Sequence, residues 1–232
     1  MRFSALLYKE LRECLPWLLL AMIIFIAASS IILRVEILDE SFINHRFSRF
    51  SPGNVIGYYE FTYYPNIREA GIWLFLLSIG LGLALGVRQF WLPNFTRTWP
   101  FLLHRSVDRG TILAAKLIAA ILTLVISLGL TWVAIYWYAS RVEAFKVPLP
   151  FRVFIEGCIF IITGFVIYLG TALSGLSRAK WYTTKIFGIA FVVTLFFIIF
   201  SQSTLAGIVL IITFFMVILL SQIIHTFGGR EF

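Results

Sequence analysis

The chain has 232 residues, of which 60% are hydrophobic and only 13% are charged, and its formal net charge is +8. Soluble domains carry roughly 45–50% apolar and about 25% charged residues, so this composition excludes an ordinary water-soluble domain. Five long stretches carry no charged residue: 15–33, 71–87, 117–140, 157–177 and 186–226.

These uncharged stretches predict an all-α membrane protein with a single transmembrane domain. A helix of about 20 apolar residues crosses the ~30 Å hydrocarbon core of a bilayer, and the fifth stretch is long enough for two helices with a polar midpoint at Gln202. Six transmembrane helices are therefore predicted, at 16–33, 69–87, 111–139, 152–176, 186–201 and 204–226.

An amphipathic helix is predicted ahead of the first span, at 2–13. At about 100° per residue its apolar side chains fall on one side and most of its charged side chains fall opposite. Such a helix lies flat in the headgroup layer, and Pro16 is predicted to break it before the chain enters the membrane. The alternative is a charged leader that is merely helical. The residues assigned to the amphipathic helix are Leu6, Leu7, Lys9, Glu10 and Leu11.

The segment 34–68 is the longest polar stretch and is predicted to lie outside the membrane. Its aromatic cluster is typical of the interfacial belt, although an outer gate is an alternative. In the second span Ser78, Gly82 and Gly86 lie four residues apart, a stripe of small residues that permits close helix packing.

The inner segment 88–110 is basic and aromatic and contains Pro93 and Pro100. It is too apolar to be a flexible linker and is predicted to form a short helix beneath the membrane. Apolar side chains exposed on the cytoplasmic side indicate a docking surface for another protein, and contact with the headgroup layer is the alternative.

The third and fourth spans carry the polar residues of interest. Lys116 is expected to extend its ammonium group to the headgroups. Thr123, Ser127 and Thr131 form a stripe that faces either a translocation path or a helix interface. Glu156 lies one turn from Arg152 near the outer surface, which indicates an exposed ion pair.

The charge distribution predicts the orientation. With the N-terminus inside, the segments 1–15, 88–116, 177–185 and 227–232 hold 3 + 5 + 3 + 1 = 12 of the 19 basic residues but only 4 of the 11 acidic ones. The inner side is then net +8 and the outer side is neutral, as the positive-inside rule requires. A multi-pass protein of the plasma (inner) membrane with both termini cytoplasmic is therefore expected, and the positive charge needs no nucleic-acid partner.

Motifs of catalysis are missing from the sequence. It contains no GxxxxGK[ST] phosphate-binding loop and none of the HExxH, CxxC or GxSxG patterns, and its three histidines fall in separate segments. No catalytic residue, metal site or cofactor is assigned to this chain, which is not expected to be an enzyme. If the protein transports a cargo, the energy must come from elsewhere.

Three features of the sequence are similar to one known family. They are the opening ALLYKELRE, the stretch TWPFLLHRSVDRGTILAAK from Thr98 to Lys116, and the six-span topology, which covers the whole chain. Together they resemble the membrane subunits of type-2 ATP-binding-cassette exporters. In that family the opening would be the elbow helix, and the stretch resembles the pattern "T..fLLs.PvsR..il..K".

This resemblance implies a permease subunit driven by a separate cytoplasmic ATPase, which would hold the ATP and Mg. A second permease copy or homologue would complete the pathway, and membrane lipid would surround both. The cargo is expected to be amphiphilic or apolar, and to be exported. The alternative is a membrane scaffold or regulatory subunit that transports nothing. The residues that the resemblance assigns to ATPase coupling are Trp99, Phe101, Leu102, Leu103, Arg105 and Arg109.

Overall fold

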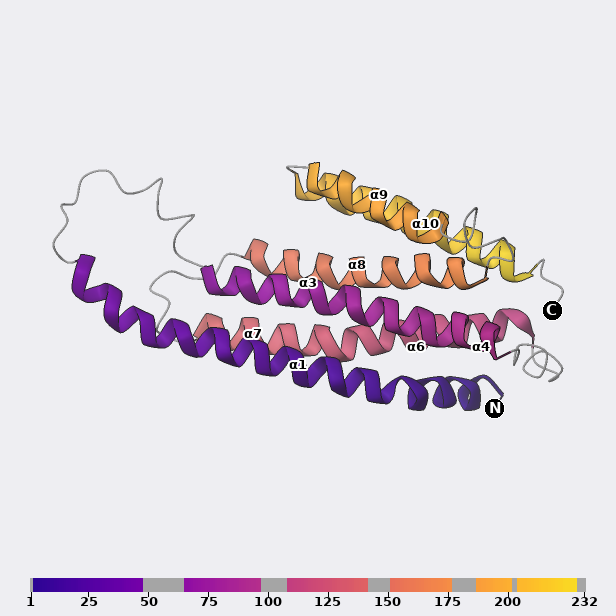
Figure 1. Ribbon diagram of the computed structural model, residues 1–232, viewed down its shortest axis with the longest axis horizontal. Helices are drawn as coiled ribbons and strands as arrows, with labels where there is room; N and C mark the ends of the chain where they lie inside the picture. The colour runs from indigo at the N-terminus through magenta and orange to yellow at the C-terminus, as the bar shows by residue number, and fades with distance from the viewer. Residues whose placement is uncertain are drawn as a thin grey trace.

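The computed structural model describes residues 2–47, 65–96, 108–141, 151–176, 187–201 and 204–228, and their elements are all helical (Figure 1). The elements are α1 (Arg2–Phe47), α3 (Pro65–Gly86), η1 (Val87–Trp91), α4 (Leu92–Phe95), α6 (Arg109–Leu124), η2 (Val125–Gly129), α7 (Leu130–Arg141), α8 (Phe151–Leu176), α9 (Phe187–Ser201) and α10 (Leu205–Gly228). The π-helical turns η1 and η2 lie within continuous helices, so α3–η1–α4 forms one rod and α6–η2–α7 another.

Five of the described helices are long and apolar enough to cross a membrane. They are Phe3–Ile31, Glu69–Phe95, Arg109–Arg141, Phe151–Leu176 and Leu205–Gly228. The predicted all-helical, multi-span character is confirmed for this part of the chain. Helix α9 occupies the place of the predicted fifth span, but its 15 residues extend only about 22 Å, less than the ~30 Å hydrocarbon core.

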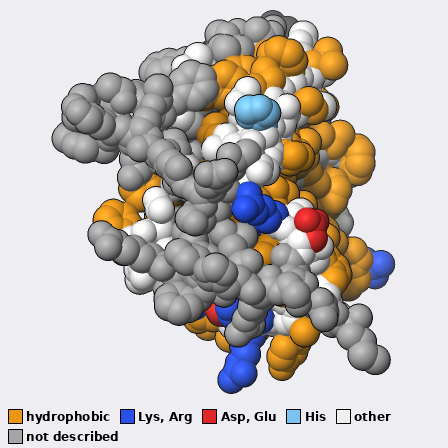
Figure 2. All heavy atoms as spheres, turned by 90° about the vertical axis from the view of Figure 1, so that its right-hand side faces the viewer, with side chains coloured by type: hydrophobic (Ala, Val, Ile, Leu, Met, Phe, Trp, Pro, Cys, Tyr) orange, Lys and Arg blue, Asp and Glu red, His pale blue; other side chains and the backbone are white. Residues whose placement is uncertain are grey.

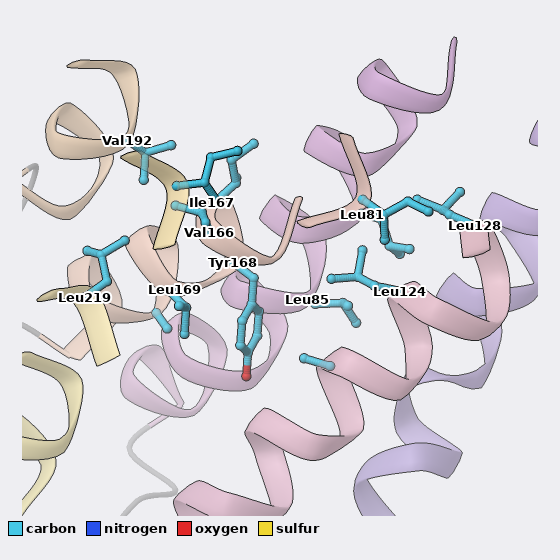
Figure 3. Close-up of a cluster of buried hydrophobic side chains, with 14 of the residues drawn as sticks. Leu81, Leu85, Leu124, Leu128, Val166, Ile167, Tyr168, Leu169, Val192 and Leu219 are labelled. Atoms are coloured by element: carbon cyan, nitrogen blue, oxygen red, sulfur yellow. The ribbon is translucent and has the colours of Figure 1, made fainter. Parts of the chain in front are cut away.

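Helix α8 is the centre of the bundle. In the most apolar 18-residue stretch of α8, 56% of the residues are buried. The corresponding share is 22% in α1 and in α10. Figure 3 shows leucines of α3, α6 and η2 on one side of the α8 residues and side chains of α9 and α10 on the other. The outer helices instead direct large apolar side chains outward, including Ile23, Ile31, Leu210 and Phe214. Such a surface is suited to lipid and unfavourable in water.

Among the described helices, α3 and α8 share the most extensive contact, and small residues make this close packing possible. A Cβ atom added to Gly82 would overlap the carbonyl oxygen of Gly164, and one added to Gly86 would lie 2.7 Å from Cβ of Thr171. The Ser78 hydroxyl donates to the carbonyl oxygen of Phe160 at 2.7 Å. The small-residue stripe predicted in the second span is therefore confirmed as a packing face.

The break predicted at Pro16 is wrong, because α1 runs without interruption from Arg2 to Phe47 with Pro16 inside it. Proline removes one helical hydrogen bond, and a membrane helix tolerates this loss where neighbouring helices support it. At ~1.5 Å per residue α1 is about 69 Å long, more than twice the thickness of the hydrocarbon core. It therefore includes both the predicted amphipathic helix and the first span.

Two other predicted boundaries differ from the structure. Helix α1 continues through 34–47, and α3 begins at Pro65, so both helices enter the segment predicted as an outer loop at 34–68. At the other end, residues 88–95 continue α3 through η1 and α4, so no separate helix begins at 88. Pro93 is the second residue of α4, directly after the π-helical turn η1, and the helical path continues through it.

The start of α1, the end of α4, the start of α6 and the ends of α8 and α10 lie together at one end of the bundle, which we call the N-terminal end (Figure 1). Figure 2 looks onto this end and shows basic, acidic and histidine side chains there, with hydrophobic side chains around them. At the opposite end the guanidinium of Arg141 lies over the Trp137 ring at 4.6 Å. Among the described helices, the start of α1 and the end of α10 therefore lie on the same side of the bundle.

Candidate functional site

Most of the predicted coupling residues lie outside the described residues: Trp99, Phe101, Leu102, Leu103 and Arg105. The sixth, Arg109, is the first residue of α6. Its guanidinium donates to the carbonyl oxygen of Gly228 at 3.3 Å. Because Gly228 ends α10, the positive charge also lies at the negative end of that helix dipole. The downstream flank of the predicted coupling segment is thereby attached to α10.

The upstream flank is attached to α8. The indole N–H of Trp91 donates to the carbonyl oxygen of Thr171 at 3.0 Å, and the Asn94 amide donates to the carbonyl oxygen of Gly175 at 3.3 Å. Gly175 is required for this approach, since an added Cβ would meet the Trp91 ring. Residues 97–107 therefore connect two points that are each fixed to the bundle.

The predicted amphipathic helix shows the expected sides in part. Leu6, Leu7 and Leu11 are half-buried, while Lys9 is exposed and forms a loose ion pair with Glu13 at 3.7 Å. An exposed pair of this kind contributes little stability. The fifth predicted residue, Glu10, is fully buried, unlike the other four.

Glu10 is buried and forms an ion pair with Lys116. The Lys116 Nζ lies 2.9 Å from the Glu10 Oε1, and both side chains are only 5–6% exposed. The prediction that Lys116 extends to the headgroups is therefore wrong. A nearby carboxylate inside the bundle offers its ammonium group a closer partner than the membrane surface does.

Three further polar side chains extend this pair. The Gln89 amide donates to Sγ of Cys14 at 3.4 Å. The Tyr168 hydroxyl lies 2.5 Å from Oε1 of Gln89 and 3.3 Å from the carbonyl oxygen of Lys116. A hydroxyl has one hydrogen, so the shorter contact takes it. We call these five residues the polar cluster: Glu10, Cys14, Gln89, Lys116 and Tyr168.

The polar cluster joins four parts of the bundle, namely α1, η1, α6 and α8. The π-helical turn η1 contributes by widening the helix, which buries the adjacent residues Gln89 and Phe90 together. Turns of this kind are frequent at functional sites. Figure 3 shows the Tyr168 ring extending from α8 past Leu85.

Sequence reasoning did not find the polar cluster. Glu10 and Lys116 are 106 positions apart, and no local pattern pairs them. One signal was present in the sequence. Glu10 lies three or four residues from Leu6, Leu7 and Cys14, on the apolar side of the helix, where a carboxylate requires a partner.

The stripe proposed for a pathway is buried. The hydroxyls of Thr123, Ser127 and Thr131 each donate to the carbonyl oxygen four residues earlier, at 2.6–2.7 Å. They are satisfied within their own helix, and their burial agrees with the alternative of a helix interface. A role in the pathway stays a prediction.

The predicted ion pair between Arg152 and Glu156 is confirmed as an exposed contact, since Nε of Arg152 lies 3.0 Å from Oε1 of Glu156. Within the described helices, no three histidine, cysteine or acidic side chains come together as a metal site would require.

Comparison with known proteins gave no relative. No family model, curated protein or solved structure matches this chain. The indications of function therefore come from the residues of the chain itself, and above all from how the helices meet at its N-terminal end.

Proposed function

We propose that this chain is the permease subunit of an ATP-binding-cassette exporter, energised by a separate cytoplasmic ATPase. In this proposal the chain crosses the plasma membrane six times with both termini in the cytoplasm. It pairs with a second copy or a homologue and exports an amphiphilic or apolar substrate. The polar end of the bundle then faces the ATPase.

The observation that carries the proposal is the attachment of both flanks of the segment 97–107. Its upstream flank is hydrogen-bonded to α8 through Trp91 and Asn94, and its downstream flank to α10 through Arg109. A segment between two fixed points transmits a push on it to the helices that hold those points. Such an arrangement is suited to a coupling helix that converts movement of an ATPase into movement of the spans.

The long α1 supports the same proposal. Its first turns lie beside the start of α6, because Glu10 contacts Lys116 less than two turns after Arg109 at the head of that helix. A push that moves α6 would reach the elbow at 2–13 through this contact. The apolar outward faces of α1 and α10 leave lipid and a second permease subunit as suitable neighbours.

The first test is affinity purification of the tagged chain in mild detergent, followed by an ATPase assay. We expect a protein with a phosphate-binding loop to co-purify and to hydrolyse ATP in a vanadate-sensitive manner. A chain that purifies without an ATPase would overturn the proposal and favour the scaffold alternative.

The second test addresses the coupling segment. The double variant Leu102→Glu/Leu103→Glu is expected to lose the ATPase, because two charges cannot enter an apolar groove without a partner. Tyr8→Glu is the matched control, since Tyr8 is 70% exposed at the same end of the bundle but lies on α1. Equal ATPase recovery from both variants would contradict the assignment of the coupling segment.

A further inference from the structure

The contact between Glu10 and Lys116 is the feature of the polar cluster that stability alone does not explain. Taking two charges out of water costs about as much as their attraction returns, and apolar replacements of similar volume are often neutral or stabilising. Both side chains are at most 6% exposed. An ionisable pair in such a place is therefore a functional candidate.

The pair is also incompletely satisfied. Among the described residues, Oε2 of Glu10 is buried without a hydrogen-bond partner. A buried carboxylate oxygen without a hydrogen-bond donor destabilises the folded state, and a hydrogen bond from water would remove this penalty. The contact between Glu10 and Lys116 is thus stabilised by the ion pair at Oε1. It is destabilised by the loss of hydration at Oε2.

The first turns of α1 are only partly covered by the rest of the bundle at the described residues around Glu10. The leucines around Glu10 are only half-buried, and the neighbouring Lys9 and Arg12 are exposed. Next along the buried face is Cys14, which is 1% exposed and receives the Gln89 amide. Between residues 3 and 14, Glu10 and Cys14 are the side chains that are buried, and both belong to the polar cluster.

We propose that the Glu10–Lys116 pair is a latch between α1 and α6, which opens to hydrate both charges and closes to exclude water from the polar cluster. In the closed state, which the structure shows, Cys14 is covered. In the open state the first turns of α1 move away from α6 and Cys14 becomes accessible. Cys14 is thus a native reporter of the latch.

The test measures the alkylation rate of Cys14 by N-ethylmaleimide in the purified full chain. The background is Cys158→Ser, because the chain has two cysteines. Lys116→Met leaves the carboxylate of Glu10 without its partner and is expected to raise the rate about tenfold or more. The double variant Glu10→Leu/Lys116→Met removes both charges. The closed state then no longer requires two charged groups to be removed from water. This double variant is expected to react more slowly than the parent.

Two controls separate the latch from general unfolding. Arg152→Met disrupts the exposed pair at the other end of the bundle and should leave the Cys14 rate unchanged. In a Cys14→Ser background, Lys116→Met should leave the rate of the half-buried Cys158 unchanged. A rise at both thiols, or no rise at Cys14, would overturn the proposal. The alkylation rate is measured on this chain alone, so the result does not depend on whether an ATPase partner binds.

Discussion

Replacing Gly86 with alanine tests whether α3 and α8 are as close as the structure has them. An added Cβ would lie 2.7 Å from Cβ and 2.8 Å from Cγ2 of Thr171, and 3.2 Å from the carbonyl oxygen of Tyr168. Ordinary van der Waals contact begins at 3.4 Å, so the helices must separate locally by 3.4 − 2.7 = 0.7 Å. No side-chain rotation relieves this clash, because the backbone fixes the position of the Thr171 Cβ.

The expected magnitude follows from two opposing terms. Overpacking of a well-packed interior costs about 1–3 kcal/mol. Replacing glycine by alanine within a helix returns roughly 0.5–1 kcal/mol, because the unfolded chain loses freedom. We therefore expect Gly86→Ala to lower the free energy of unfolding by about 1–2 kcal/mol, which corresponds to roughly 2–8 °C in Tm for a chain of this size.

The assay is thermal unfolding of the purified chain in one detergent, with Gly80→Ala as the matched control. Gly80 lies in the same helix but is exposed, and an added Cβ would meet nothing within 4 Å. Gly80→Ala keeps the helix-propensity gain without the clash, so its Tm is expected to be unchanged or raised. Equal shifts in the two variants would refute the close packing of α3 on α8.

Two further variants test the polar contacts by the same thermal assay. Tyr168→Phe removes the donor to the buried Oε1 of Gln89 and is expected to lower the free energy of unfolding by about 1–3 kcal/mol; an unchanged Tm would show that this hydrogen bond does not stabilise the fold. Glu156→Gln disrupts the exposed pair with Arg152 and is expected to change stability by less than about 0.5 kcal/mol, so a shift as large as that of Tyr168→Phe would contradict the assignment of the pair to the surface.

The positions of three of the five long described helices could be predicted closely from the sequence, because length and polarity are local properties of a span. The predicted ranges 111–139, 152–176 and 204–226 differ by at most two residues at either end from the helical stretches Arg109–Arg141, Phe151–Leu176 and Leu205–Gly228. A polar or charged residue at each end of such a range makes continuation into hydrocarbon unfavourable.

The course of the N-terminal helix could not be predicted from local rules. Pro16 is a helix breaker in water, yet α1 continues through it. A contact that holds the turns before Pro16 against the bundle comes from Lys116 on α6, which is 106 positions from Glu10. Local propensity is a weak prior that tertiary contacts override.

The sequence by itself determined that several helices are long and apolar enough to cross a membrane, because long uncharged runs of apolar residues are stable in hydrocarbon and not in water. Only the tertiary structure decided which polar residues meet. Glu10, Gln89, Lys116 and Tyr168 come from four separate segments, and their partnership follows from the packing of α1, α3 and α6 around α8. Helical periodicity fixes the side on which a residue lies, but the residue it contacts depends on which helix packs there.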